Sequence, residues 1–360
     1  MRTLPRLAVP KGSTVLVTGA NGLLGSHIAD QFLTYGYKVR GTVRDPEKSS
    51  WLANVFEKRH GKGSFELFKV PDMAAKSAFD EAVKGVSIVA HSASVLSFDF
   101  NPHNVIPDVI AGAINALKAA HAESSVKRFV FTSSSAAAVS STIGAPGIKV
   151  TEETWNDDAV KEAWAEPPYT PERAAPVYSA SKTQAEQEVW KYHKEHQNER
   201  PDLVVNTANT LQVLPNVNFG KSVDPVRQGF PSSAGMPALL YNGQVADFHH
   251  MVPRQYFIDT QDTGRLHVAA GIFDHVQGQR IFGMAYPFSW DSILEILRKI
   301  EPEKIFPENF SGGEDPNEIE PRDKAEQLLR ELGRPGWTTL EESIQGTLEG
   351  LQLAEKAASA

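Results

Sequence analysis

Thr14–Leu33 reads TVLVTGANGLLGSHIADQFL, a β-branched apolar run followed by glycines and then by apolar residues at helical spacing. The run Thr14–Thr18 predicts a strand, and Leu23–Leu33 predicts a helix. Gly19, Gly22 and Gly25 lie between and within them at the spacing G-x-x-G-x-x-G. The first glycine permits a tight exit from the strand, the second lets the backbone approach a pyrophosphate, and the third lets helix and sheet pack closely. The segment therefore predicts the first βα turn of a dinucleotide-binding fold, with phosphates at the helix N-terminus.

Similar apolar runs alternate with helical patterns over the first two-thirds of the chain. Further strands are predicted at Lys38–Val43, Phe65–Val70, Ser87–Ala90, Arg128–Thr132, Leu203–Thr207 and Arg280–Phe282. Helices are predicted at Val109–Ala120, Ser179–Glu195, Asp262–Ala270, Asp291–Arg298, Lys324–Leu332 and Leu340–Leu353. Strands separated by helices are typical of βαβ units, so the expected fold class is α/β, a Rossmann-type doubly wound parallel sheet.

The pattern also predicts two unequal parts. Residues 11–210 are expected to form the nucleotide-binding Rossmann domain, to which 256–283 returns. Between Pro215 and Pro253, prolines, glycines and scattered aromatics replace clear periodicity. We therefore expect 211–255 and 284–360 to form a smaller, C-terminal substrate-binding lobe.

Composition excludes several classes of function. The 360 residues are 41% hydrophobic and 22% charged, with a formal charge of −8, which argues against nucleic acid or an anionic membrane as the main partner. Cysteine is absent, so thiolate catalysis and cysteine-ligated metals are excluded, and no metal-ligand spacing occurs among the 11 histidines. No secretory signal, membrane span or lipidation motif is found, and we expect a cytoplasmic protein.

The end of the second predicted strand indicates which dinucleotide binds. An acidic residue there would bind the ribose hydroxyls of NAD, but the strand ends at Val43 and Arg44 follows. Arginine suits a ribose 2′-phosphate, and Arg40 and Arg44 share parity and could project to the same side. We therefore expect NADP(H), with Arg44 as the main contact and Lys48 as support. The alternative is a solvated basic loop.

Further along the chain lie hydroxyl and amine groups that are suited to proton transfer. The fifth predicted strand ends in Thr132-Ser133-Ser134-Ser135, and Tyr178-Ser-Ala-Ser-Lys182 comes 44 residues after Ser134. Tyr178 and Lys182, at i and i+4, share one helix face. The ammonium could lower the pKa of the phenol, and a serine at the strand end could hold a substrate carbonyl beside it. The serine-rich strand end or the Tyr178/Lys182 pair alone is weak evidence for a catalytic site, but the two together with the glycine turn are strong evidence.

These residues resemble the extended short-chain dehydrogenase/reductase family, and the whole length resembles its dihydroflavonol-reductase-like branch. The markers are TGANGLLG, HSAS after the fourth strand, FTSS after the fifth, YSASK, and the ending LGRPGW. The resemblance implies that Ser134 is the catalytic serine, Tyr178 the proton donor and Lys182 its partner. The expected cofactor contacts are Gly19, Asn21, Gly22, Leu23, Leu24, Arg44, Lys48, Asp72, Met73, Ala93, Ser94, Tyr178 and Lys182. The chain departs from the family at Ala208, where a proline is usual, and over 215–235.

The expected activity is NADPH-dependent, reversible reduction of aldehydes or ketones to alcohols, with the proton supplied by Tyr178. The partner is a small-molecule carbonyl compound, apolar or aromatic, and a homodimer is possible. Substrate-pocket candidates are Phe98, Met236, Tyr241 and Met251. Two alternatives stay open: an NAD-dependent nucleotide-sugar epimerase or dehydratase, and a non-catalytic dinucleotide sensor.

Overall fold

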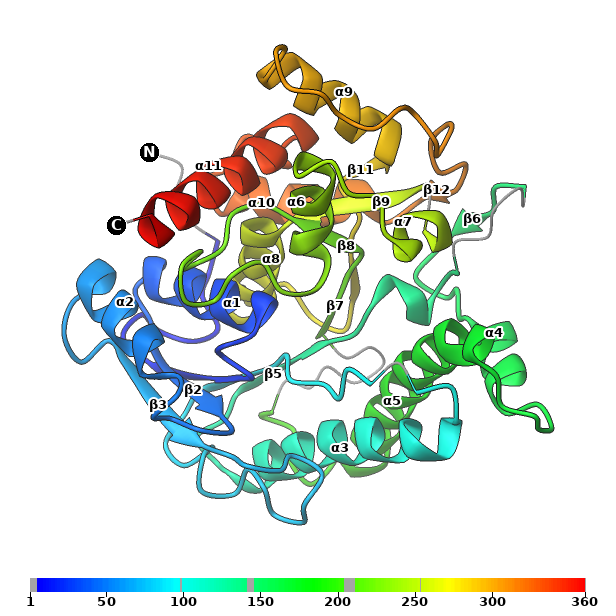
Figure 1. The fold of residues 1–360 in the computed structure, drawn as a ribbon. Helices are drawn as coiled ribbons and strands as arrows, with labels where there is room; N and C mark the ends of the chain where they lie inside the picture. The colour runs from blue at the N-terminus through cyan, green and yellow to red at the C-terminus, as the bar shows by residue number, and fades with distance from the viewer. Residues whose placement is uncertain (1–4, 98, 141–145, 204–210, 253, 360) are drawn as a thin grey trace.

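A seven-stranded parallel sheet forms the centre of the molecule (Figure 1). The computed structural model describes residues 5–97, 99–140, 146–203, 211–252 and 254–359. The strand order is β10-β7-β5-β4-β1-β2-β3. The strands are β1 (Thr14–Thr18), β2 (Lys38–Val43), β3 (Phe65–Lys69), β4 (Ile88–His91), β5 (Arg128–Thr132), β7 (Leu211–Pro215) and β10 (Arg280–Gly283). Every neighbouring pair is parallel, so the predicted α/β class and parallel sheet are confirmed.

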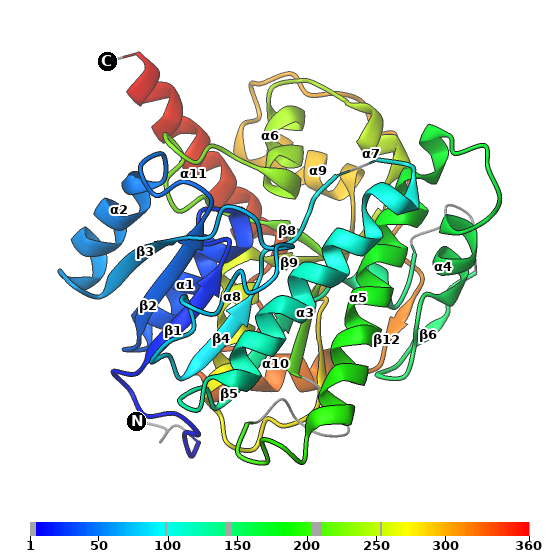
Figure 2. The same cartoon turned by 90° about the horizontal axis from the view of Figure 1, so that it is seen from below.

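Helices cover both faces of this sheet. One face carries α1 (Leu23–Thr34) and α8 (Thr260–Ile272), and the other carries α3 (Ile106–Ala122) and α5 (Ala174–His196), which run side by side in Figure 2. Val15 and Val17 of β1 pack into the core on the first face, and Leu16 into the core on the second. Because both faces are covered, the inner strands β4 and β5 are buried at every residue rather than at alternate ones.

A smaller unit is built around the three-stranded sheet β11-β9-β8. Its strands and helices are β8 (Val217–Phe219), β9 (Arg254–Asp259), β11 (Tyr286–Ser289), α6 (Gly235–Tyr241), α7 (Asp247–Met251), α9 (Trp290–Ile300) and α11 (Leu340–Ala358). Its core is aromatic, with Phe219, Phe288 and Trp290 in edge-to-face contact. A two-stranded ladder pairs β6 (Lys149–Val150) with β12 (Glu318–Ile319), and α10 (Arg322–Glu331) packs on α8 and β10.

The structure differs from the sequence prediction in the sixth strand, in the segment 256–283 and in two of the helices. The sixth strand was expected at Leu203–Thr207, of which 204–207 lie outside the described residues; within the described residues, the sheet contains β7, Leu211–Pro215. The sheet therefore continues five residues past the boundary expected at 210. In the segment 256–283, α8 and β10 do return to the large sheet, whereas β9 belongs to the small one. The helices α2 (Ser50–His60) and α4 (Asp157–Ala163) were not predicted.

Candidate active site

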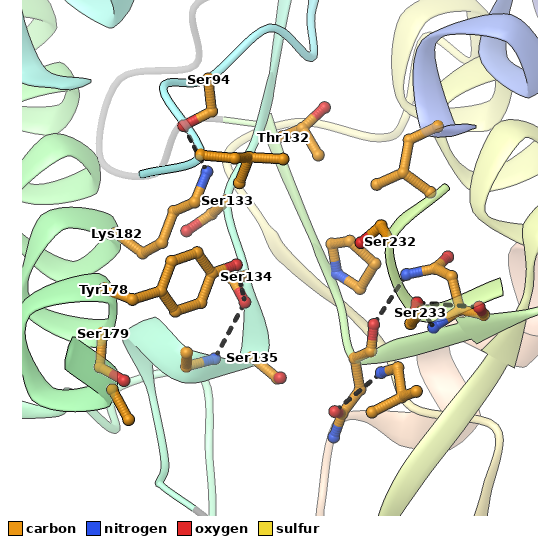
Figure 3. Close-up of a pocket in the computed structure, with 18 of the residues that line it drawn as sticks. Ser94, Thr132, Ser133, Ser134, Ser135, Tyr178, Ser179, Lys182, Ser232 and Ser233 are labelled. Carbon is orange, nitrogen blue, oxygen red and sulfur yellow. Dashed lines mark hydrogen bonds between the residues drawn. The ribbon is translucent and has the colours of Figure 1, made fainter. Parts of the chain in front are cut away.

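The segments that follow β1, β2, β4 and β5 line one cavity of about 1880 Å³. They meet because the carboxyl ends of parallel strands lie at the same edge of a sheet. Figure 3 shows the part of the cavity at the end of β5, with Tyr178 and Lys182 reaching in from α5 and Ser232 and Ser233 on the opposite side. The cavity thus extends from the nucleotide-binding turn to the smaller unit.

The glycine turn has little room for side chains. Gly19 has φ +66°, in the left-handed region, and a Cβ there would lie 3.2 Å from Ala93. A Cβ on Gly25 would lie 2.2 Å from the Gly19 carbonyl oxygen, so this glycine lets the helix start pack on the turn itself. Gly22 is the N-cap of α1, and as a glycine it places no side chain over the helix N-terminus. The first-turn N–H groups and the positive end of the helix dipole suit a pyrophosphate.

The basic residues near β2 separate in the structure. Arg44, directly after β2, has an exposed side chain and lines the cavity. Arg40 does not join it: its Nε donates to Glu66 Oε1 at 2.6 Å and its Nη1 donates to the Ala82 carbonyl. Lys48 is 86% exposed, lies 3.9 Å from Asp45, and is not among the residues that line the cavity. Arg40 is thus bound to Glu66 and the Ala82 carbonyl and does not line the cavity beside Arg44.

The other expected cofactor contacts lie along the cavity wall. Asp72 and Met73 follow β3, and Ala93 and Ser94 follow β4. The segment after β4 is fixed to β1, because the Ser92 and Ala93 N–H groups both donate to Thr18 Oγ1 at 3.0 Å. Asn21, Leu23 and Leu24 also line the cavity. Of the residues expected to bind cofactor, Lys48 alone is outside the lining.

Ser134, Tyr178 and Lys182 come together as the spacing predicted. The Tyr178 hydroxyl donates to Ser134 Oγ at 3.5 Å, and Lys182 Nζ donates to Ser94 Oγ at 2.9 Å (Figure 3). Ser134 Oγ also accepts from the Ala136 N–H, capping the short 3₁₀ turn Ser135–Ala137. Lys182 Nζ lies 6.0 Å from the centre of the Tyr178 ring. A phenol, a hydroxyl and an amine therefore face the same part of the cavity.

Burial changes the pKa of both titratable groups. It lowers the pKa of Lys182 to about 8, because a charged amine is poorly solvated there. It raises the pKa of Tyr178, and the hydrogen bond to Ser134 opposes that change. The sequence predicted that Lys182 would lower the pKa of Tyr178. The net direction is the opposite, because loss of solvent around the phenol dominates.

Two of the residues predicted for the substrate pocket line the cavity, and one does not. Met236 and Met251 line the cavity, and Met251 is 62% exposed. Tyr241 does not: its ring is buried in the aromatic core of the smaller unit and its hydroxyl donates to Glu301 Oε1 at 2.8 Å. Its prediction as a pocket residue is therefore wrong, since the ring completes a core. Phe98 lies outside the described residues.

Sequence reasoning missed a wall formed by residues 154–162. By its composition, the acidic, Trp-containing stretch Glu152–Asp158 indicates a solvated loop or a helix start. It does start α4, with Asn156 as the N-cap, and Trp155 and Asn156 also line the cavity. Asn156 Nδ2 donates to the Ala136 carbonyl at 2.8 Å and to Ser140 Oγ at 2.7 Å, so it supports the turn after Ser134. An Asn before two acidic residues is a helix-start signal, but nothing in its spacing indicates that contact.

Comparison with known proteins agrees with this geometry. The family model described as the NAD dependent epimerase/dehydratase family matches residues 15–206. The chain belongs to this family. Among curated family relatives, aldehyde reductase 2 of Sporidiobolus salmonicolor is 39% identical over 348 residues, covering 96% of this chain and 98% of that protein. Ketoreductase adrE of Penicillium rubens is 39% identical over 347 residues, covering 94% and 96%.

A solved structure is similar over the same length. Yeast methylglyoxal/isovaleraldehyde reductase Gre2, complexed with NADPH, matches with a TM-score of 0.77 and 25% identity, covering 95% of this chain and 99% of that chain. The predicted resemblance to extended short-chain dehydrogenases is therefore confirmed, since the epimerase/dehydratase family belongs to that group. No helix of the described residues is long and apolar enough to cross a membrane.

Proposed function

We propose that this protein is an NADPH-dependent carbonyl reductase, which reduces aldehydes or ketones to alcohols and catalyses the reverse oxidation. The observation that carries the proposal is the meeting of Ser134, Tyr178 and Lys182 in the cavity that begins at the glycine turn. The names of its relatives support the same reaction: an aldehyde reductase, a ketoreductase, and a reductase solved with NADPH.

The residues along the cavity fit a dinucleotide phosphate. The open N-terminus of α1 after Gly22 would bind the pyrophosphate, and Arg44 the 2′-phosphate. Asp72 and Met73 would contact the adenine side, and Ala93 and Ser94 the nicotinamide side. Bound NADPH supplies the hydride that is added to the carbonyl carbon. Lys48, on the exposed surface near Asp45, would contribute a weaker, screened charge.

The chain's own groups would complete the reaction at the carbonyl oxygen. Ser134 and Tyr178 are close enough to donate to one oxygen atom placed between them. Tyr178 would give its proton to that oxygen as the carbonyl is reduced to the alcohol. Lys182 would hold the cofactor ribose, and its charge would favour the phenolate left behind. In the oxidation direction, the phenolate takes the proton back from the alcohol.

An apolar or aromatic carbonyl compound fits the cavity best. Leu96, Ile148 and Met251 line it and are 62%, 47% and 62% exposed. Single exposed apolar residues are ordinary, but three large ones around one cavity are typical of a binding surface for an apolar ligand. A cytoplasmic location and a homodimer are further predictions from the sequence.

The test is NADPH consumption by purified protein across a panel of aldehydes, ketones and ketoesters. Tyr178→Phe should lower kcat by at least about 100-fold while the cofactor still binds. A variant that keeps near-native reduction would contradict the proposal. Release of NAD on denaturing the protein would favour an epimerase or dehydratase, and NADPH binding without turnover by the wild type would favour a sensor.

A further inference from the structure

A buried carboxylate continues the helix face that carries Tyr178 and Lys182. Glu186 lies one turn beyond Lys182 on α5, at i+4, and none of it is exposed. Ser133 Oγ donates to Glu186 Oε2 at 2.5 Å, and Arg280 Nε donates to Glu186 Oε1 at 2.7 Å. Ser133 is the residue before Ser134. One carboxylate therefore joins the end of β5, the helix that carries the phenol, and β10.

Arg280 extends the connection to residues 152–155, which lead into α4 and of which Thr154 and Trp155 line the cavity. It is 4% exposed, and its Nη1 donates to the carbonyls of Glu152 at 2.9 Å and Thr154 at 2.6 Å. Its guanidinium lies over the Trp155 ring, 4.2 Å from the centre. Trp155 lines the cavity beside Asn156, which supports the turn after Ser134. The Glu186–Arg280 pair thus contacts Ser133, the residue before Ser134, and the segment that leads to Asn156.

Stability alone is a weak reason for this pair. Two charges removed from water cost free energy that their attraction only partly offsets, so buried ion pairs add little net stability. Within the described residues, Arg280 Nη2 is buried without a hydrogen-bond partner, which adds a further cost. Burial also raises the pKa of Glu186, against the effects of Arg280 and Ser133. What Glu186 does supply is a fixed register between α5 and the end of β5, because its carboxylate also accepts the hydrogen bond from Ser133.

We infer that Glu186 is a positioning residue, which sets the separation of Ser134 and Tyr178 by holding Ser133 and Arg280. The inference rests on the proposed roles of Ser134 and Tyr178 in carbonyl reduction. A displacement of about 1 Å between reacting groups can lower a rate by about 100-fold. The Ser134–Tyr178 contact, at 3.5 Å, is already at the limit of a hydrogen bond, so a small shift would break it.

The experiment compares Ser133→Ala and Glu186→Gln with Ser343→Ala. Ser343 is a matched control because it is 1% exposed and its Oγ donates to a buried carboxylate, Asp259 Oδ2, at 2.9 Å, outside the cavity. We expect kcat for carbonyl reduction to fall about tenfold in S133A and about 100-fold in E186Q, with NADPH affinity by fluorescence titration within about twofold of wild type. S343A should change stability but not kcat.

A second measurement separates positioning from general loosening of the fold. The hydrogen bond from Tyr178 to Ser134 lowers the pKa of the phenol, and Lys182 is the charged side chain that lies near it on the same helix. If Ser134 moves away, the pKa of Tyr178 rises, and alcohol oxidation, which needs the phenolate, should reach half-maximum at a higher pH. Ser134→Ala should raise the pH of half-maximal alcohol oxidation in the same way.

Two results would overturn the inference. One is that S133A and E186Q lower the melting temperature as S343A does but keep wild-type kcat and pH midpoint per folded molecule. The other is that NADPH affinity and kcat fall together, which indicates a general disturbance of the site. If E186Q does not fold, S133A alone decides, since it leaves the ion pair intact. A wild type inactive on the whole carbonyl panel would instead refute the proposed function.

Discussion

Lys182 Nζ donates to Ser94 Oγ at 2.9 Å, and this contact joins α5 to the segment that follows β4. Lys182 is 5% exposed, and burial lowers the pKa of its amine to about 8. A hydroxyl oxygen beside a buried ammonium favours the charged form. Ser94 therefore contributes to keeping Lys182 protonated at neutral pH.

Ser94→Ala should narrow the pH range of carbonyl reduction. With the acceptor gone, the pKa of Lys182 falls further, so activity is lost at a lower pH on the alkaline side than in wild type. At pH 7 we expect kcat to fall by no more than about tenfold. The measurement is kcat against pH from 6 to 10, with Ser125→Ala, at the opposite end of the sheet, as control. An unchanged alkaline limb would refute this role for Ser94.

Arg44→Ala should reverse the preference between NADPH and NADH. Arg44 lines the cavity, whereas Lys48 is highly exposed and outside the lining, so the two charges are not equivalent. We expect the KM for NADPH to rise about 10- to 100-fold in R44A while that for NADH changes little. Lys48→Ala should change the KM for NADPH by less than about twofold. Equal effects of the two substitutions would contradict the assignment.

Gly25→Ala should remove cofactor binding and destabilise the protein. The added Cβ would lie 2.2 Å from the Gly19 carbonyl oxygen, so the turn or the start of α1 must move. We expect the free energy of unfolding to fall by about 1–3 kcal/mol and NADPH binding to be lost. Gly313→Ala is the control, because no atom lies within 4 Å of its added Cβ. Titration of NADPH and urea unfolding of both variants test this, and full NADPH affinity in G25A would contradict it.

Acid should destabilise the fold through buried imidazoles. Burial lowers the pKa of His27 and His267 to about 4, against 6.5 for an ordinary histidine. The unfolded chain therefore takes up these protons before the folded one does, and stability falls as the pH drops from about 6.5 toward 4. Each group should remove about 2 kcal/mol of unfolding free energy between pH 7 and pH 5.

His27→Gln tests one of these two groups. Its amide can still donate to the Lys221 carbonyl, as His27 Nε2 does at 2.8 Å, but it cannot titrate. Urea unfolding at pH 7 and pH 5 should show a smaller loss for H27Q than for wild type. Identical losses in the two proteins would contradict the role of His27.

Much of the sheet was predictable, because its strands are short apolar runs bounded by turn residues. β1, β2 and β5 begin and end at the predicted residues. The helix α2 was missed because few of its residues are buried and its composition is polar. β7 was not predicted at Leu211–Pro215, because LVVNT and LQVLP are both apolar runs and local pattern does not distinguish between them; residues 204–207 of the predicted strand lie outside the described residues.

The site was predictable where its residues are close in sequence or follow strands. Tyr178 and Lys182 share a helix face by spacing alone, whereas the strand end indicates only a serine, and the family resemblance selects Ser134. Glu186 has the same helical spacing as Lys182, which is a usable signal, but its contact with Arg280 crosses 94 positions of the chain. Tyr241 was misplaced because an aromatic residue has the same pattern in a core as in a pocket.

The chain passes repeatedly between the two sheets: β7 lies in the large one, β8 and β9 in the small one, β10 in the large one and β11 in the small one. No single cut therefore separates the unit that binds the nucleotide from the unit that surrounds the substrate. Exchange of the contiguous segment that holds the whole smaller unit, residues 217–358, would also exchange α8 and β10, and with β10 the Arg280 that binds Glu186. In this architecture, new specificity has to arise by replacing individual loops and side chains around an inherited reaction centre.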